Sequence, residues 1–418
     1  MEKECIMSVD PHQHQRSSAL TRVSIRSLPF EVLLAIFKIV YADSASTFNG
    51  VETCLRDRYV APGEPQADSP PSDGSIPIPL VDPRAGDPII DPLSHTNFPY
   101  SVASVCTQWR DIVLTEPIFW ASPIITVGAC RPLFEPTSQS HFELSRDYFL
   151  DIKIVCREEL SASQPSSEQA DVMALLPYIY KVFHRCNSIS FHLNRSSSLP
   201  SLARHFGTVM WNLEHVELRC KIDDGRNTLP APCHCHAKKG FSCTWSLVVD
   251  GHNLKDLIKY PGERRGLRRL GLLSDIVISG YSASASEPDP LSLYDMLKAL
   301  EDVGIMRLTL QNIDLDLAVP ATVSKPNVRL LGMRAVSFED LSGDLIDAAF
   351  GFALDLVANT RITRCSLPRS KIRTRHLTLE AINKEENLHS FLLSRWRGRA
   401  LSVKDCPQFN DTPSGTVT

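Results

Sequence analysis

The chain has 418 residues, of which 43% are hydrophobic and 22% are charged, with a formal net charge of −4. This composition is typical of a globular protein and excludes a disordered polymer. The near-neutral balance argues against a general nucleic-acid binder, because the phosphate backbone is usually met by a strongly basic surface. At roughly 100 to 200 residues per domain, the length allows two or three domains, or one small module followed by a repeat array.

No apolar run reaches the roughly 18 residues that a bilayer-spanning helix needs. The longest run, Val32 to Ala42, contains Lys38 and follows Glu31, which is unlike the core of a secretory signal. We therefore expect a protein of the cytoplasm, the nucleus or both, with no membrane partner. In those compartments the 12 cysteines are expected to be reduced thiols.

Two helical segments are the first elements predicted along the chain, after a loose tail at residues 1–24. Pro29 suits the first turn of a helix, and the residues from Val32 to Tyr41 are apolar on nearly every side. A second segment carries apolar residues at helical spacing from Val102 to Val113.

A Pro-rich stretch at residues 61–92, with several Asp and little apolar pattern, separates the two helical segments. Such a composition cannot bury a core and favours an extended insertion, at about residues 43–97 in all. Because loop-closure entropy rises only with the logarithm of loop length, both helical segments can still belong to one module.

Beyond Trp120 the pattern changes to short strand-like runs separated by helical or irregular stretches. Strands are predicted at residues 124–127, 151–155, 188–193, 215–220, 246–249, 268–273, 306–312, 328–333, 376–379 and 400–403. Helices are predicted at residues 172–186, 291–303 and 341–359.

Several of these runs have the apolar spacing of a leucine-rich repeat. The best matches are Leu213, Val216 and Leu218, then Leu267, Leu270 and Leu272, and then Leu308 and Leu310 followed by Asn312. One strand cannot hide its own apolar face, so neighbouring units must stack, which predicts a curved α/β solenoid with a long concave surface. The alternative is an ordinary α/β domain with irregular strands.

The N-terminal segments resemble an F-box. The resemblance rests on the residues from Leu28 to Phe37, on Val102 to Ile112, and on Glu116 to Trp120. It is nearest to the F-box-like families of mushroom-forming fungi, whose C-terminal part is a divergent leucine-rich-repeat-like region. The stretch from Phe391 to Pro407 is also similar to the end of such chains. The long Pro-rich insertion is a departure from the family.

The resemblance implies a small three-helix F-box at residues 25–122 and a leucine-rich-repeat-like α/β solenoid at residues 123–418. In such a protein the F-box binds the Skp adaptor subunit and, through it, a cullin of a ubiquitin ligase. The solenoid captures a protein substrate, whose identity the sequence does not indicate. No catalytic role and no cofactor is implied for the chain itself. The alternative is an F-box scaffold that binds its partners without leading to ubiquitylation.

The resemblance also indicates which side chains contact the adaptor. They are Leu28, Pro29, Val32, Leu33, Ile36, Phe37, Val105, Cys106, Trp109 and Trp120. A three-helix module can bury only one side of a helix that is apolar on nearly every side. For each of these residues the alternative is burial in the module's own core, and we expect the first helix to be divided between the two surfaces.

One cluster of soft ligands could hold zinc: Cys233, His234, Cys235, His236 and Cys243, with Cys220 upstream. Zinc prefers four such ligands in tetrahedral geometry. However, the usual pair of Cys-x-x-Cys knuckles is missing, and adjacent side chains cannot all point at one ion. We favour a surface loop without metal over a zinc- or thiol-dependent enzyme.

Charge is divided unevenly along the chain. Residues 1–200 hold 16 basic and 23 acidic side chains, whereas residues 201–418 hold 28 and 25. The basic side chains concentrate in two groups: Arg264, Arg265, Arg268 and Arg269, and Arg361, Arg364, Arg369, Lys371, Arg373 and Arg375. On a binding face these groups would hold an acidic or phosphorylated substrate. The alternative is a solvated surface.

Overall fold

The computed structural model of the chain describes residues 28–48, 98–128, 140–156, 166–206, 213–225, 245–259, 273–282, 289–301, 303–319, 323, 328–330, 332–354, 357–383 and 386–407. These residues fall into two units. The N-terminal unit holds the described residues up to 113, and the sheet unit holds those from 114 onward. None of the described helices is long and apolar enough to cross a membrane.

The described part of the N-terminal unit is helical and contains α1 (Phe30–Phe48), α3 (Tyr100–Ala103) and the start of α4 (Thr107–Thr115). The carbonyl of Pro29 accepts hydrogen bonds from the amides of Val32 and Leu33, both at 3.1 Å, and so starts α1. Leu33 and Phe37 are buried, and the Phe37 ring meets Trp109 edge-on with 4.9 Å between centroids. Because positions i and i+4 share a helix face, α1 buries one stripe inside this unit.

The sheet unit is of the α/β class and contains one sheet of eleven parallel strands, in which the strand order follows the chain from β1 to β11. The strands are β1 (Ile124–Val127), β2 (Leu150–Cys156), β3 (Cys186–Arg195), β4 (His215–Ile222), β5 (Ser246–Asp250), β6 (Asp275–Ser282), β7 (Arg307–Asp314), β8 (Ala335–Glu339), β9 (Asn359–Thr363), β10 (His376–Glu380) and β11 (Ala400–Lys404).

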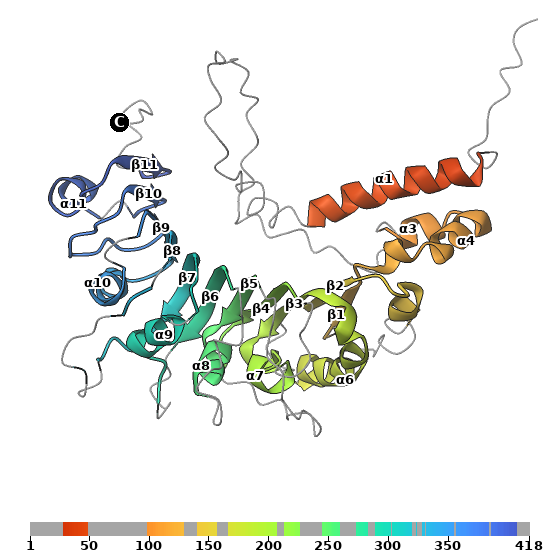
Figure 1. Cartoon of the computed structure of the whole chain (residues 1–418), viewed down its shortest axis with the longest axis horizontal. Coiled ribbons are helices and arrows are strands. Elements are labelled where there is room, and N and C mark those ends of the chain that lie inside the picture. The colour runs from red at the N-terminus through yellow and green to blue at the C-terminus, as the bar shows by residue number, and fades with distance from the viewer. Residues whose placement is uncertain are drawn as a thin grey trace, which may run out of the picture. The chain divides into compact units, whose positions relative to one another are not determined.

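Helices and 3-10 turns occupy the connections. They are η3 (Pro117–Trp120), α6 (Ser166–Val182), η4 (Phe183–Arg185), η5 (Ser196–Ser198), α7 (Leu202–His205), α8 (Gly251–Lys259), α9 (Leu293–Leu300), α10 (Gly343–Phe352) and α11 (Leu388–Ser394). Figure 1 shows α6 to α11 following one another along the same side of the sheet. The side chains of Ser201, Ser292, Ser342 and Asn387 cap α7, α9, α10 and α11.

Two rows of mostly apolar side chains run along the sheet on the face that the helices cover. They follow the strand register, so each row adds one residue per strand. The first row is Ile152, Ile189, Val216, Leu247, Ile276, Leu308, Val336, Thr360, Leu377 and Leu401. The second is Ile125, Ile154, Phe191, Leu218, Val249, Ile278, Leu310, Phe338, Ile362, Leu379 and Val403. Stacked in this way, each strand hides the apolar side chains of its neighbours.

The strands from β6 to β11 share one backbone turn, which lies inside β6 and β7 and directly follows β8, β9, β10 and β11. A left-handed residue with φ between 46° and 62° stands at the same register position in each: Gly280, Asn312, Asp340, Arg364, Ala381 and Asp405. This conformation turns the next side chain back to the covered face. Those next side chains, all buried, are Tyr281, Ile313, Leu341, Cys365, Ile382 and Cys406. The turn therefore adds a third inward row to the repeat.

Most of the predicted elements are confirmed, with strands at or near the expected positions for β1 to β5, β7, β10 and β11. The strand predicted at 328–333 is wrong. Val328 and Met333 are buried there, but they precede β8 and join no strand. The strand predicted at 268–273 lies outside the described residues except for Leu273. β6, β8 and β9 were not predicted, whereas α6 with η4, α9 and α10 confirm the three helices.

Candidate functional site

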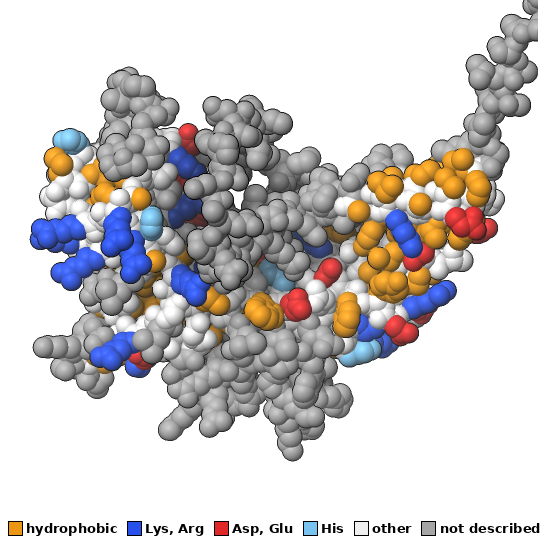
Figure 2. Space-filling model, turned by 45° about the horizontal axis from the view of Figure 1, so that its top comes forward, with side chains coloured by type: hydrophobic (Ala, Val, Ile, Leu, Met, Phe, Trp, Pro, Cys, Tyr) orange, Lys and Arg blue, Asp and Glu red, His pale blue; other side chains and the backbone are white. Residues whose placement is uncertain are grey.

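The outer side of α1 carries large apolar side chains in solvent. Val32, Ile36 and Ile39 are 43%, 37% and 63% exposed, and their i, i+4, i+7 spacing places them on one helix face. We call these three residues the α1 apolar face. Phe30 and Val40 on the same helix are also exposed. Figure 2 shows hydrophobic side chains gathered along α1. Exposed apolar residues gathered in this way mark interaction sites.

The structure divides the ten residues predicted to contact an adaptor. Pro29, Val32, Ile36 and Val105 are exposed, and Leu28, Cys106 and Trp109 are half-buried. Leu33, Phe37 and Trp120 are buried, and Trp120 belongs to the sheet unit. Ile39, the most exposed of the α1 apolar face, was not among the predicted residues. Its position three residues after Ile36 on an apolar helix is the signal that indicates it.

The face of the sheet opposite the described helices is mainly polar, and it carries a cluster around Glu217 of β4. The Glu217 carboxylate lies 3.2 Å from Nε2 of His192 and 3.6 Å from Nε2 of His215, and it also pairs with Arg219. Ser190 donates a hydrogen bond to it at 3.2 Å. Burial by itself would raise the pKa of Glu217, but the two nearby histidines and the charge of Arg219 outweigh it and hold the pKa well below its ordinary value.

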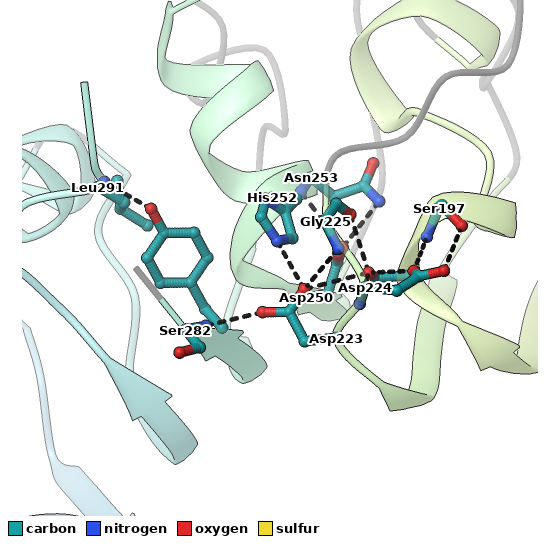
Figure 3. A network of polar contacts seen from close by, with 11 residues as sticks. Ser197, Asp223, Asp224, Gly225, Asp250, His252, Asn253, Ser282 and Leu291 are labelled. Carbon is teal, nitrogen blue, oxygen red and sulfur yellow. Dashed lines mark hydrogen bonds and ion pairs between the residues drawn. The ribbon is translucent and has the colours of Figure 1, made fainter. Parts of the chain in front are cut away.

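A second polar network joins the C-terminal ends of β4, β5 and β6 (Figure 3). Nε2 of His252 lies 2.7 Å from Oδ1 of Asp223, whose Oδ2 accepts the amide of Ser282 at 2.7 Å. Asp224 accepts the amide of Ser197 at 2.9 Å. Burial of Asp223 would raise its pKa, but the hydrogen bonds from His252 and Ser282 lower it. These contacts tie the edges of successive strands together.

Asp250 lies at the buried end of this network. Its Oδ1 accepts hydrogen bonds from the amide and the side chain of Asn253, at 3.2 and 2.7 Å. Burial raises the pKa of Asp250, and Asn253 reduces the shift only in part. Gly251 follows directly, and a Cβ there would lie 2.3 Å from Cβ of Tyr281, so only glycine allows α8 to start this close to β6.

The network does not have the geometry of a nucleophilic triad. The single hydroxyl hydrogen of Ser196 is shared among acceptors on Asp223, Asp224 and the Gly225 carbonyl, at 3.1, 3.0 and 2.8 Å, and the hydroxyl oxygen accepts the Asp224 amide. A nucleophilic serine instead donates to its histidine base. Within the described residues, no group of three or more His, Cys, Asp or Glu side chains could hold a metal ion.

The cysteine cluster considered for zinc, Cys233 to Cys243 with its two histidines, lies outside the described residues. Its upstream member Cys220 is described, and burial followed by the nearby carboxylates, chiefly Asp250, raises its pKa. Burial likewise raises the pKa of Cys186 to about 12 and that of Cys365 to about 11. A thiol that is held protonated is a poor nucleophile.

The structure describes only one of the two basic groups found in the sequence. Arg264 to Arg269 lie outside the described residues. In the second group, Arg361 pairs with Glu380 on the next strand, and Arg364 donates to both oxygens of Asp340 at 2.8 and 2.7 Å. The remaining cations of this group are exposed.

No protein-family model, no curated protein and no solved structure matches this chain.

Proposed function

We propose that this chain is a substrate adaptor of the F-box type. Its N-terminal unit binds the Skp subunit of a cullin-containing ubiquitin ligase, and its sheet unit captures the protein to be ubiquitylated. Catalysis is supplied by other subunits of that ligase. The observation that carries the proposal is the α1 apolar face, on a helix whose sequence resembles an F-box.

The α1 apolar face supports the proposal because α1 already uses its other side for folding. Leu33 and Phe37 are buried in the N-terminal unit, in which Val102, Ile112 and Val113 are also buried, and the Phe37 ring contacts that of Trp109. The described part of that unit covers the stripe of α1 that carries Leu33 and Phe37, whereas the α1 apolar face, about 100° around the helix from that stripe, lies in solvent. Apolar side chains that flank a buried stripe in this way favour a second surface that covers them.

An energy estimate indicates how large the bound surface must be. Fully burying a side chain such as Ile or Val stabilises by roughly 1.5 to 3 kcal/mol. Because Val32, Ile36 and Ile39 are already about half covered, the three together contribute roughly 2 to 5 kcal/mol when bound. Association costs about 4 to 15 kcal/mol. The partner must therefore contact additional residues, and Phe30, Val40 and Val105 are exposed candidates in this unit.

The repeat in the sheet unit supports a leucine-rich-repeat-like solenoid over an ordinary α/β domain. The strands from β6 to β10 share one pattern of positions. In β7 a buried residue, Ile305, comes three residues before the first inward position, Leu308; the second inward position, Leu310, follows two residues later, and the left-handed residue, Asn312, two residues after that. A doubly wound domain has a shuffled strand order and helices on both faces. The sequential strand order favours stacked repeats.

Co-expression of the full chain with a Skp subunit tests the proposal. We expect the two proteins to co-purify, and the double variant Val32→Asp, Ile36→Asp to lose at least tenfold in affinity, because it places two charges in the apolar contact. The matched control is Leu393→Asp on α11, since Leu393 is 75% exposed. Equal binding by the double variant, with circular dichroism showing both variants folded, contradicts the proposed face.

The non-proteolytic scaffold remains the second candidate and is separated by one further measurement. If the chain directs ubiquitylation, the half-life of a bound target increases when the chain is deleted. Equal half-lives for all bound proteins with and without the chain favour the scaffold.

A further inference from the structure

Five exposed cations gather at one end of the sheet unit: Lys371, Arg373, Arg375, Arg397 and Arg399. We call them the cationic surface. Figure 2 shows Lys and Arg side chains concentrated over the part of the unit that carries β10 and β11. Arg397 and Arg399 were not expected from the sequence. They join the surface because β11 pairs with β10 in register.

The cationic surface is built on two chain segments that lie side by side. The amides of Arg399 and Ala400 donate to the carbonyl of Arg375, at 2.8 and 3.1 Å. Further along, Ile372 forms a parallel bridge with Trp396, and its amide donates to the carbonyl of Arg395 at 2.9 Å. The positions of the cations are therefore fixed by backbone hydrogen bonds.

Along residues 371–375, buried and exposed side chains alternate, and the cations occupy the exposed positions. Ile372 and Thr374 are buried, so Lys371, Arg373 and Arg375 between them are exposed. The Thr374 hydroxyl donates to a backbone carbonyl at 3.1 Å, which anchors the segment from inside.

The cationic surface differs from the neighbouring arginines in its pairing. Arg361 and Arg364 are matched by Glu380 and Asp340, whereas no described carboxylate forms an ion pair with any of the five cations. Asp347, near the start of the first segment, accepts the backbone amides of Arg369 and Ser370 at 2.7 and 2.8 Å.

We propose that the cationic surface binds an extended acidic segment of the target protein, with carboxylate or phosphoryl groups at alternate positions. This inference rests on the proposed function, because the acidic segment is taken to belong to the protein that the sheet unit captures. Arginine pairs bidentately with either group. Nucleic acid suits the surface less well, because five cations neutralise few phosphates and the chain as a whole carries a net charge of −4.

Fluorescence anisotropy on the full chain tests the proposal with three labelled peptides of one length. They carry alternating Glu, alternating phosphoserine, or alternating Gln. We expect the first two to bind with an affinity that falls as salt rises, and the Gln peptide to bind at least tenfold more weakly. The ratio between the Glu and phosphoserine peptides distinguishes an acidic from a phosphorylated source.

The double variant Arg375→Glu, Arg399→Glu is expected to lose at least tenfold in affinity for both charged peptides. The matched control is Lys221→Glu, Arg334→Glu, which changes net charge equally at exposed positions elsewhere in the sheet unit. Equal loss in both double variants overturns a local site, and so does tighter binding of a single-stranded oligonucleotide of the same charge.

Skp binding separates the two proposals. The Arg375→Glu, Arg399→Glu variant is expected to bind the Skp subunit normally, and the Val32→Asp, Ile36→Asp variant to bind peptide normally. Failure of peptide binding with intact Skp binding overturns the cationic surface alone, whereas failure of Skp binding in the wild-type chain overturns the F-box proposal.

Discussion

The two units differ in how completely they bury their apolar side chains. In the sheet unit, inward positions such as Leu310 and Phe338 are fully buried, and the outward positions between them, such as Thr309 and Ser337, are polar. On α1, apolar residues occupy both the buried stripe and the exposed one. A stacked repeat supplies its own cover for every strand, whereas the described part of the N-terminal unit covers α1 on one side only. This difference is the physical argument for a partner at α1.

Truncating one apolar residue in each unit gives the largest expected difference. Phe338→Ala removes a ring that packs against Phe350 of α10, with 5.9 Å between centroids, and should cost about 3 to 5 kcal/mol of unfolding free energy. Ile39→Ala on the α1 apolar face should cost less than about 0.5 kcal/mol, because Ile39 is 63% exposed. Urea titration followed by circular dichroism measures both.

The comparison fails if Ile39→Ala destabilises the chain as strongly as Phe338→Ala does. That result would mean that α1 is covered on both sides in the protein itself. Phe37→Ala serves as the internal reference, because Phe37 lies on the same helix and is buried. It should lose stability on the scale of Phe338→Ala.

The strand pattern could be predicted from the sequence wherever inward residues are large. β7 and β10, with two Leu at alternate positions, were predicted, but β9, whose inward residues are Thr360 and Ile362, was not. β6 was not predicted, because Leu267, Leu270 and Leu272, which precede it in the chain, match the leucine-rich-repeat spacing better than its own Ile276 and Ile278 do. A division of α1 between two surfaces was expected, but the sequence did not indicate which apolar residues would be buried, because they span more than half of the helix circumference.

The sheet unit also buries titratable groups, and one of them, His141, makes a contribution to the pH dependence that a single variant can isolate. Burial lowers the pKa of His141 from its ordinary value of 6.5 to about 4. At His141 the unfolded state therefore binds more protons between these values, so the contribution of His141 to the unfolding free energy should fall as pH decreases from about 6.5 to about 4. The loss is up to about 3 kcal/mol at about 1.4 kcal/mol per pKa unit. The raised pKa of Asp250 contributes in the opposite direction, so the His141 contribution is read from the difference between the wild-type chain and a variant that lacks His141.

Urea titrations at several pH values measure this loss, with His141→Gln as the variant that cannot gain the proton. We expect the variant to show a smaller decrease across the same pH range, whatever its stability at pH 7. An identical slope in the two proteins contradicts a buried neutral His141, whose ring lies 4.9 Å from that of Trp120.

The polar sites could be predicted only in part, because they depend on how neighbouring strands are aligned. Glu217 of β4 is far along the chain from Ser190 and His192 of β3, and they converge because β3 and β4 pair at that register. In the same way, Arg375 and Arg399 become neighbours through the pairing of β10 with β11. The sequence shows which residues alternate outward along one strand, but not which strands are adjacent or how they are aligned.

The smallest predicted effect tests whether the strand ends form a true repeat. Ala381 adopts a φ of 52°, and the left-handed region costs a non-glycine residue about 1 to 2 kcal/mol. Ala381→Gly removes that cost but adds about 0.5 to 1 kcal/mol of unfolded-chain entropy, so we expect a net stabilisation of about 0.5 to 1 kcal/mol.

Ala335→Gly, in β8 outside the left-handed position, is the control and should destabilise by about 0.5 to 1 kcal/mol. A stability loss of the same sign in both variants, measured by thermal unfolding, would mean that the left-handed turn following β10 is not formed in solution. The stacked geometry that buries Ile382 beside Leu379 would then need a different explanation at this strand.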